Sequence, residues 1–490
     1  MRLSRRLFLQ SGAAAAATLA VRPSWALGTC SPSGGPRKVL EIFLRGGASQ
    51  FGAFWYDATL GGATGTGDAT RNADDPGHGV KWNEITSPTP QTSTWTAATG
   101  SPTLGRTVSP LFETRLNGFG QQMPKLSDYM RVLRVRHELL PHEAAIPYAT
   151  TGTTLGRQKQ SGLGAAIWRR ADEANPGTSA IRSLVFQAGS ASGDSLAANY
   201  TASFGNHTAA RRPPIITLGD PDFFYALERA NFTATDPVKY YYRTRYDSWM
   251  RYAGTPVRSA GFSAYESSLD TMRLHAPALY ALLLNYEPTL FPLVVPATYT
   301  DNLTRRAIET AVSLLSAGTN DLEHVAVIDG GVEDDYDTHK TPAGRSAATI
   351  QNGNLWSVLD ELATWSETII DSQIVVLIHS EFGRKEKGQG LTGTEHHMRG
   401  YVNVVISDLI TDPDYVGDIG GTDNDEAEYS GGLLPGLSPT DVHAAVAQLA
   451  GIDPWDPDMF DRDLACLPDP APNTNPDPAS ELLGVTMTCP

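Results

Sequence analysis

Cysteine is scarce in this sequence of 490 residues, which has only Cys30, Cys466 and Cys489. None of the three belongs to a Cys-x-x-Cys pair or to a Cys/His zinc pattern, so the sequence excludes a zinc finger and a thioredoxin-type redox motif. All three lie near the ends of the chain, which leaves the core without cysteine. One disulfide in an oxidising compartment fits this arrangement. The sequence leaves the pairing open, with Cys466 and Cys489 closing the shorter loop.

Positive charge is also in short supply. The chain has 38 Lys and Arg against 54 Asp and Glu, a formal net charge of −16. Nucleic acids and anionic membranes are bound by basic surfaces, so neither is an expected partner. No run of residues after residue 26 approaches the ~18 apolar residues of a membrane span. We therefore expect no stable membrane span once the N-terminal segment has been removed.

The N-terminal segment 1–26 has the parts of a twin-arginine export signal. Arg5 and Arg6 precede an Ala-rich run, and Ser24-Trp25-Ala26 is a small-x-small cleavage site. Cleavage there removes four arginines and no acid, which takes the formal net charge from −16 to −20. We predict export by the twin-arginine machinery to the periplasm or the outside of the cell. An uncleaved N-terminal anchor is the alternative.

Apolar runs predict the strands of a mostly parallel sheet. The predicted strands cover residues 39–44, 131–135, 214–218, 325–328, 374–378 and 402–406. Apolar residues from Leu355 to Ile369 recur at helical spacing, and the order strand, helix, strand implies a right-handed βαβ crossover. We predict one α/β domain over residues 27–465, with the sheet sandwiched by helices.

Two stretches are predicted to be long insertions in this domain. Residues 58–105 are rich in Gly, Thr, Ser and Pro without a clear period, and residues 171–299 are predicted to be partly helical and to lie over the sheet as a lid. Ser438 followed by Pro439 predicts the start of a last helix, which ends near Gly451. The Pro- and Asp-rich tail 466–490 is predicted to wrap the surface loosely or to be disordered.

Three short polar pieces adjoin the ends of predicted strands. Their candidate site residues are Asp337, His339, Glu381, Arg384, Glu395, His396 and His397. Because open α/β sheets bind ligands at the carboxyl ends of their strands, we expect these pieces to converge there. Carboxylates and imidazoles suit Zn²⁺ or Mn²⁺ better than Mg²⁺ or Ca²⁺. The sequence thus predicts one divalent metal or none, since each piece alone also fits a solvated loop.

Two further features at this edge allow two interpretations each. Arg384 can bind the anionic group of a substrate, or it can form an ion pair with Glu381 or Glu386. The loop 46–50 can present backbone N–H groups to an anion, or it can be only a tight turn.

Segments along most of residues 37–465 share the motifs of a known family. They are residues 43–50, 132–152, 337–339, 380–384, 393–397 and 440–453. Of these, Ser-Glu-Phe-Gly-Arg at 380–384 is the most diagnostic. The sequence resembles the exported family 1501 of the domains of unknown function, a relative of the alkaline phosphatase and sulfatase superfamily. The resemblance implies an alkaline-phosphatase-like sheet, with Asp337, His339, Glu381 and His396 near the superfamily's metal positions.

The resemblance also shows departures. Ser49 stands where the superfamily usually has a metal-binding Asp, and Glu381-Phe382 stands where it usually has Asp-His, which implies one metal or none in place of two. His142 lies ten residues before Gly152, similar to the spacing of a sulfatase nucleophile. This position implies a nucleophile, a proton carrier or a ligand. A hydrogen-bonded structural histidine is the plain alternative.

Two functions follow from these observations. The first is an exported, metal-assisted hydrolase that acts on a small anionic phosphate or sulfate ester, with His142 and Arg384 as catalytic residues. The second is a non-catalytic extracytoplasmic binding or assembly protein that has kept the sheet and has a degenerate metal site.

Overall fold

A computed structural model describes the sheet, helices that pack on it and segments at one of its edges. The described residues are 31–48, 56–57, 93–94, 106–108, 124–154, 157, 159–174, 181–188, 213–217, 303–318, 321–330, 336–337, 355, 358–384, 396–397, 401–416, 437–456, 459–460 and 478–488. The predicted signal segment, the three cysteines and nearly all of both predicted insertions lie outside them.

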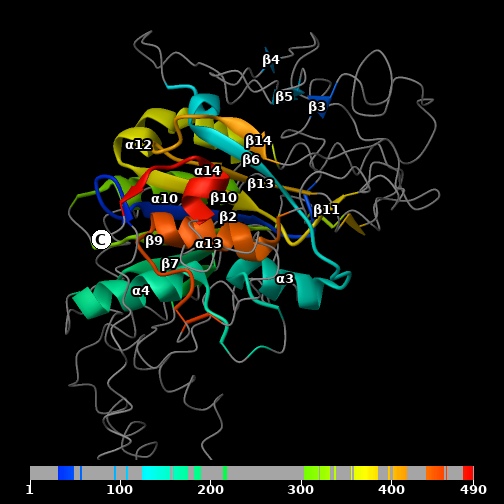
Figure 1. The fold of residues 1–490 in the computed structure, drawn as a ribbon, viewed down its shortest axis with the longest axis horizontal. Helices are drawn as coiled ribbons and strands as arrows, with labels where there is room; N and C mark the ends of the chain where they lie inside the picture. Colours follow the sequence, from blue (N-terminus) through cyan, green and yellow to red (C-terminus); the bar gives the residue numbers. More distant parts are fainter. Residues whose placement is uncertain are drawn as a thin grey trace, which may run out of the picture.

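An eight-stranded sheet in the order β14-β6-β13-β10-β2-β9-β7-β8 forms the centre of the molecule (Figure 1). Its strands are β2 (Lys38–Leu44), β6 (Met130–Val135), β7 (Ser183–Ala188), β8 (Ile215–Thr217), β9 (His324–Asp329), β10 (Ile374–His379), β13 (Tyr401–Ile406) and β14 (Asp414–Val416). All six predicted strands are present, and the predicted α/β class is confirmed. The sequence patterns did not predict β7 and β14.

One strand runs against the others. β13 is antiparallel to both of its neighbours, β10 and β6, whereas the remaining neighbours in the sheet are parallel. The sheet is therefore mostly parallel, as predicted. The sequence patterns did not predict that the strand at 402–406 would be the antiparallel one among these eight.

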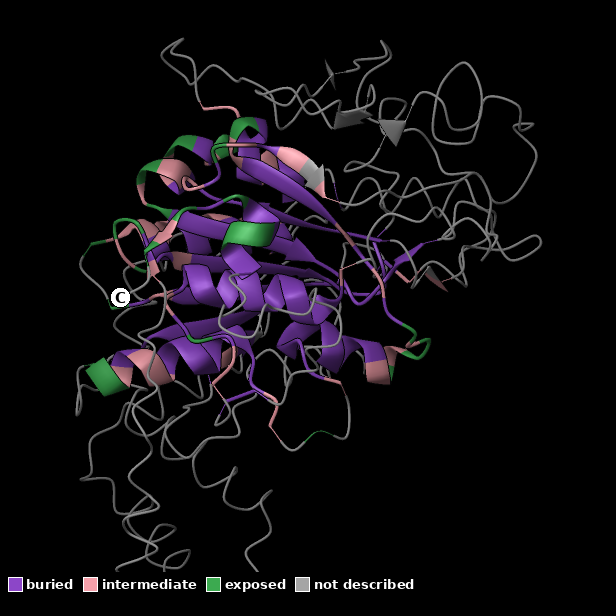
Figure 2. Ribbon diagram, in the orientation of Figure 1, coloured by how far each residue is buried: buried purple, intermediate pink, exposed green. Residues whose placement is uncertain are grey.

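Helices cover both faces of the sheet, which explains strands that are apolar without alternation. Leu40, Ile42 and Leu44 of β2 pack on one face, and Val39 and Phe43 on the other. The first face is covered by α10 (Leu303–Ser316), the helical residues 358–364 and α12 (Ser366–Asp371). The second is covered by α3 (His142–Thr151), α4 (Leu163–Ala174) and α13 (Pro439–Leu449). Figure 2 shows the resulting buried layer between partly exposed helices.

The helix α13 begins and ends where the sequence predicts. The Ser438 N–H donates to the Asp441 carboxylate at 2.6 Å, which completes a capping box, and Pro439 is the first residue of the helix. Gly451 has φ +69°, a left-handed conformation that favours glycine just beyond a helix. Every residue of α13 is buried, so this helix belongs to the core.

The end of the chain differs from the prediction of a loose tail. Residues 478–488 form α14 (Pro478–Leu483) and β15 (Met487–Thr488), with Ala479 and Leu483 fully buried. β15 pairs with β1 (Ser31–Pro32), so the described part of the chain begins and ends in the same two-stranded sheet. The apolar side chains of Leu482 and Leu483, with Val485, supply the burial that holds this segment.

Six short elements complete the description. β3 (Tyr56–Asp57), β5 (Arg106–Val108) and β4 (Ser93–Thr94) form a small sheet in the order β3-β5-β4, β11 (Gly383–Arg384) pairs with β12 (His396–His397), and η3 (Leu126–Tyr129) precedes β6. Among the described helices, none combines the length and the apolar character needed to cross a bilayer.

Candidate metal centre

The predicted site residues meet at the edge of the sheet where the parallel strands end. Asp337 follows β9, and Glu381 and Arg384 follow β10. His142 is the first residue of α3, and His396 lies on β12. The expected proximity is therefore present for Asp337, Glu381 and His396, and His142 joins them.

His396 reaches this edge for a different reason from the one predicted. It precedes β13, and a β13 parallel to β10 would have its amino end at the opposite edge of the sheet. Because β13 is antiparallel, its amino end lies at the carboxyl end of β10. Pairing of β11 with β12, in which Arg384 is opposite His396, then fixes the approach.

Glu381 holds His142 by one ring nitrogen. Its side chain is fully buried, and Oε1 lies 2.9 Å from His142 Nδ1. The Gly46 N–H donates to the same oxygen at 2.7 Å, and the Ser380 hydroxyl donates to Oε2 at 3.1 Å. An ionised carboxylate only accepts hydrogen bonds, so we assign the Nδ1 proton of His142 to this contact. The other nitrogen, Nε2, is left to face the cluster.

His142 Nε2 points toward Asp337 without forming a hydrogen bond. It lies 3.5 Å from Asp337 Oδ2, and it is a buried polar atom that lacks a hydrogen-bond partner in the structure. The second oxygen of this carboxylate, Oδ1, accepts a bond from Arg384 Nη2 at 2.7 Å. Asp337 is thus held on one side and directed at His142 on the other.

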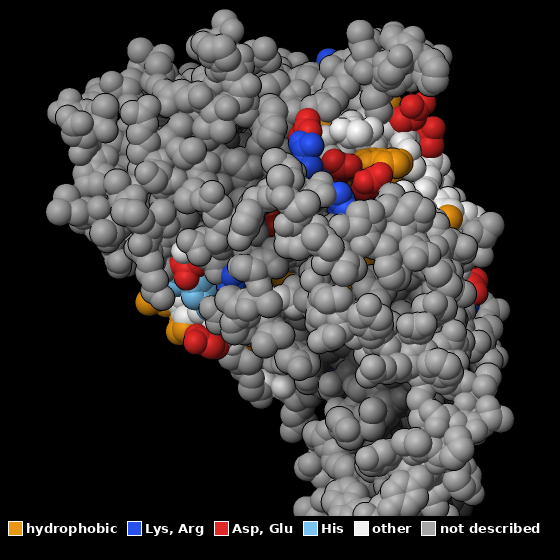
Figure 3. Space-filling model, turned by 180° about the vertical axis from the view of Figure 1, so that it is seen from behind, with side chains coloured by type: hydrophobic (Ala, Val, Ile, Leu, Met, Phe, Trp, Pro, Cys, Tyr) orange, Lys and Arg blue, Asp and Glu red, His pale blue; other side chains and the backbone are white. Residues whose placement is uncertain are grey.

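His396 completes a group of three possible ligands. One ligand atom each from His142, Asp337 and His396 lies within 4.8 Å of the other two. His396 Nδ1 lies 3.0 Å from the Leu140 carbonyl oxygen, so this nitrogen donates and Nε2 is the remaining ligand atom. In Figure 3 histidine side chains reach the molecular surface beside acidic and basic ones.

The three side chains share an arrangement that metal sites need. Each has one polar atom held by another group, which is Glu381 for His142, Arg384 for Asp337 and the Leu140 carbonyl for His396. Such outer partners fix the orientation and tautomer of metal ligands. Two imidazoles and one carboxylate suit Zn²⁺, and three protein ligands leave a coordination position open, as in catalytic zinc sites. The residues present therefore fit one divalent cation.

The carboxylates determine the charge of His142 when no metal is bound. Burial by itself lowers the pKa of His142, but the close approach of the Asp337 carboxylate, together with the hydrogen bond and charge of Glu381, outweighs burial and raises the pKa to about 9. Burial raises the pKa of Asp337, but His142 and Arg384 together hold it well below its usual range. At neutral pH the metal-free cluster is an ion-pair network, and a cation bound through Nε2 takes the place of the proton.

Phe382 closes the cluster on one side. Its ring is buried and stacks on His396 at a centroid distance of 3.9 Å, with His142 at 4.8 Å. An aromatic ring in this position supplies no ligand and excludes water from one side of the imidazoles. Phe382 stands where the resemblance would place a histidine ligand, so the residues at this position fit one metal in place of two.

Two glycines let the loop after β2 approach the cluster. Gly46 has φ +106°, and a Cβ there would lie 2.3 Å from the Asp337 backbone nitrogen; Gly47 has φ +89°, and a Cβ there would lie 2.6 Å from the Phe382 ring. Only glycine combines this backbone with this spacing. The Gly46 N–H is used by Glu381, so the tight-turn interpretation of this loop is supported for its described residues.

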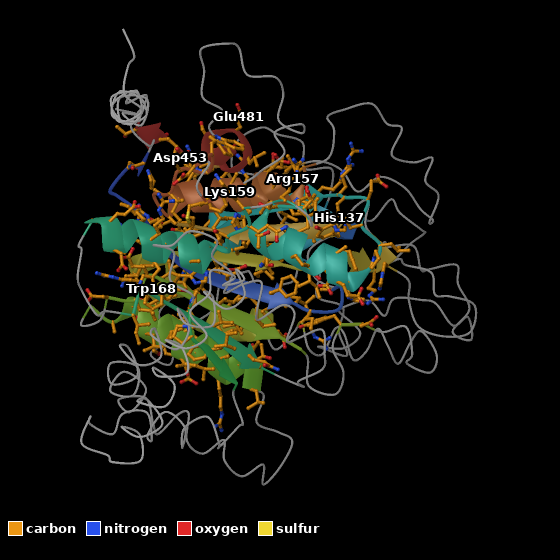
Figure 4. All side chains as sticks on the ribbon, turned by 90° about the horizontal axis from the view of Figure 1, so that it is seen from below. His137, Arg157, Lys159, Trp168, Asp453 and Glu481 are labelled. Carbon is orange, nitrogen blue, oxygen red and sulfur yellow. The ribbon has the colours of Figure 1, made fainter. Side chains whose placement is uncertain are left out.

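His137, which was not among the predicted site residues, positions Glu381. Its Nδ1 accepts a bond from the Leu139 N–H at 3.0 Å, so the proton is on Nε2, which donates to the Glu381 carbonyl at 2.5 Å. Its ring lies between Tyr148 and Tyr401, and burial lowers its pKa. Figure 4 shows His137 beside α3, near the end of the sheet. Its position just after β6 was the only available signal.

The outcome for the remaining predicted residues is mixed. Arg384 is fully buried and pairs with Asp337, so the structure supports the ion-pair alternative with a partner other than Glu381 or Glu386. Its guanidinium also bonds the Gly46 and Gly47 carbonyls. Four predicted positions, Ser49, His339, Glu395 and the His397 side chain, lie outside the described residues.

A second polar group lies inside the sheet and was not predicted. Glu41 of β2 is fully buried between His324 Nε2 at 3.1 Å and His379 Nε2 at 2.9 Å. The Ser183 hydroxyl lies 2.7 Å from His324 Nδ1, so these groups form one chain across four strands. Burial raises the pKa of Glu41, but the two histidines outweigh burial and hold the pKa well below its ordinary value. The two histidines therefore favour the ionised form of this carboxylate.

Comparison with known proteins finds similar chains among solved structures. No family model matches the chain, and no curated protein matches it. The chain is similar to the structure of a protein in the alkaline phosphatase superfamily from Vibrio parahaemolyticus, with 12% sequence identity, 90% of this chain and 74% of that chain covered, and a TM-score of 0.36. A likeness at this level transfers no residue role. The resemblance to family 1501 receives no confirmation from these comparisons.

Proposed function

We propose that this chain is an exported, metal-dependent hydrolase of phosphate or sulfate esters. The observation that carries the proposal is the convergence of His142, Asp337 and His396, each held by an outer partner, at the carboxyl edge of the sheet. Motif resemblance to relatives of the alkaline phosphatases and sulfatases supports the ester class. The acidic composition supports a small substrate over a nucleic acid.

The residues divide into ligands and positioning groups. His142 Nε2, an Asp337 oxygen and His396 would hold the cation, with Zn²⁺ or Mn²⁺ favoured. When bound, such a cation polarises an ester oxygen or acidifies water. Glu381 orients His142, and Arg384 orients Asp337. His142 thereby acts as a ligand in this proposal, which replaces the roles of nucleophile and proton carrier.

Metal analysis tests the proposal directly. We expect about one equivalent of transition metal in protein purified without chelator, and hydrolysis of aryl phosphates or sulfates that is lost on chelation and restored by Zn²⁺ or Mn²⁺. Asp337→Asn removes a ligand charge and is expected to leave well under half an equivalent. Glu173→Gln, the same chemical change at an exposed helix position, is the matched control and keeps the metal. Full metal in Asp337→Asn would show that the cluster is not the site.

Export is the second part of the proposal, and the twin-arginine pair tests it. Arg5→Lys with Arg6→Lys keeps the charge but removes the planar guanidinium groups, so the precursor is expected to stay in the cytoplasm with residues 1–26 attached. Arg2→Lys with Arg22→Lys makes the same change outside the pair and should be exported normally. Cell fractionation and the N-terminal mass of the product decide the result. Equal export of both double variants would rule out the twin-arginine route.

A non-catalytic binding or assembly protein is the second candidate function. The burial of Arg384 and its ion pair with Asp337 favour it, because they already engage the cation that would otherwise bind a substrate anion. Absence of both metal and ester hydrolysis in the experiment above is the result that selects this candidate.

A further inference from the structure

The two-stranded sheet formed by β1 and β15 brings together two chain segments that each adjoin a cysteine in the sequence. Ser31 is opposite Thr488, and Pro32 is opposite Met487, in an antiparallel pair. Cys30 directly precedes Ser31, and Cys489 directly follows Thr488. Both cysteines lie just outside the described residues, and they would be opposite each other if the same antiparallel register continued by one residue.

The spacing of an antiparallel pair suits a disulfide. Residues directly opposite each other have Cα atoms roughly 4.5 to 5.5 Å apart, whether or not the pair is hydrogen-bonded. A disulfide requires Cα atoms about 4.4 to 6.8 Å apart. The register therefore meets the distance requirement in either type of pair.

Both strands are held firmly by the rest of the molecule. On the N-terminal side, Arg37 donates to the Gly35 and Ser33 carbonyls and pairs with Asp408 at 2.9 Å, which fixes the turn between β1 and β2. On the C-terminal side, α14 packs on α13 with Leu483 fully buried. The register is thus set by contacts beyond the two short strands themselves.

We propose that Cys30 and Cys489 form a disulfide and that Cys466 is left as a free thiol. The two thiols lose two protons and two electrons to a disulfide oxidant, such as oxidised glutathione or a disulfide oxidoreductase, which is reduced to two thiols. The bond closes nearly the whole mature chain into one loop, and closing a long loop stabilises by restricting the unfolded chain. Its formation in the cell rests on the proposed export, so the test below supplies the oxidant itself.

Peptide mapping of the oxidised full-length chain identifies the pair. The folded protein is purified reduced, oxidised with a glutathione redox mixture and alkylated before digestion. Trypsin alone leaves Cys466 and Cys489 on one peptide, because no Lys or Arg follows Arg462. An added protease that cuts before Asp469 and Asp477 separates them. We expect peptide 477–490 linked to the Cys30 peptide, with Cys466 alkylated.

Single variants give the controls. Cys466→Ser should keep the link and should show the same rise in melting temperature on oxidation as the unmodified sequence, whereas Cys489→Ser should lose both. A Cys466 to Cys489 link, a Cys30 to Cys466 link, or three alkylated thiols after oxidation would overturn the proposal. Because no step uses metal or substrate, failure of this pairing and failure of the hydrolase proposal are separate results.

Discussion

The His142→Ala variant is expected to lose tight metal binding and hydrolysis together, by more than the roughly 10- to 100-fold that loss of an outer partner costs in metal affinity, because the substitution removes a ligand that reaches the cluster through Nε2. Glu381→Gln is expected to be milder. The amide oxygen can still accept from His142 Nδ1, so only the charge behind the imidazole is lost, at a cost of about 10- to 100-fold in metal affinity. Zinc titration calorimetry and ester assays on both variants give the comparison.

The ratio of the two effects identifies the role of Glu381. If Glu381 orients His142, the glutamine variant keeps measurable zinc binding at higher metal concentration, whereas His142→Ala does not. Equal losses in both variants would instead make Glu381 a ligand, as the sequence analysis first placed it. The pKa of His142 in the metal-free protein supplies an independent measurement, because loss of the Glu381 charge should lower it from about 9. Histidine proton NMR follows this shift.

Glu41→Ala is expected to lower the free energy of unfolding by about 3 to 5 kcal/mol, because it leaves two buried imidazoles without the carboxylate that they contact. Glu41→Gln keeps the shape and some of the hydrogen bonding, so its cost should be smaller, on the order of 1 to 3 kcal/mol. Urea unfolding at pH 7 measures both. A surface change such as Glu173→Gln should stay within about 0.5 kcal/mol of the unmodified protein.

The pH dependence of stability distinguishes the contribution of the Glu41 charge from that of Glu41 packing. The folded-state pKa of Glu41 lies below its ordinary value of 4.5, so its contribution to stability is present above that pH and is lost as the pH falls below it. The difference in urea midpoint between the unmodified protein and Glu41→Gln should therefore shrink on going from pH 6 to pH 3. A difference that is constant over this range would mean that Glu41 is not ionised in the fold.

Apolar runs and capping residues predicted the sheet because burial on both faces leaves a direct mark on the sequence. The strand at 325–328, the helix ending near Ile369 and the cap at Ser438 are all in place. The direction of β13 leaves no such mark, because a buried parallel strand and a buried antiparallel strand have the same apolar pattern. Only the connection that precedes it decides, and that connection has no clear period.

The candidate site was predictable in part because residue type and position at strand ends are also visible in the sequence. Residue type and place at strand ends brought out Asp337, Glu381 and His396, but the division into ligands and positioning groups depends on which atom faces which neighbour. Glu41 did leave a signal: it interrupts the apolar run of β2, and a buried carboxylate requires partners. Its partner histidines lie hundreds of residues away along the chain, so only the fold identifies them.

Because β1 pairs with β15, the two ends of the described chain lie together. Both are at the edge of the sheet where β2 begins. The candidate site lies where β2 ends, seven residues away, or roughly 20 Å at the rise of an extended strand. In Figure 1 the C-terminus and β11 accordingly stand at opposite sides. A domain fused to either end would therefore lie at the edge of the sheet opposite the candidate site. The two ends can also be joined, with new ends made in an exposed loop, to give a circular permutant that keeps the sheet.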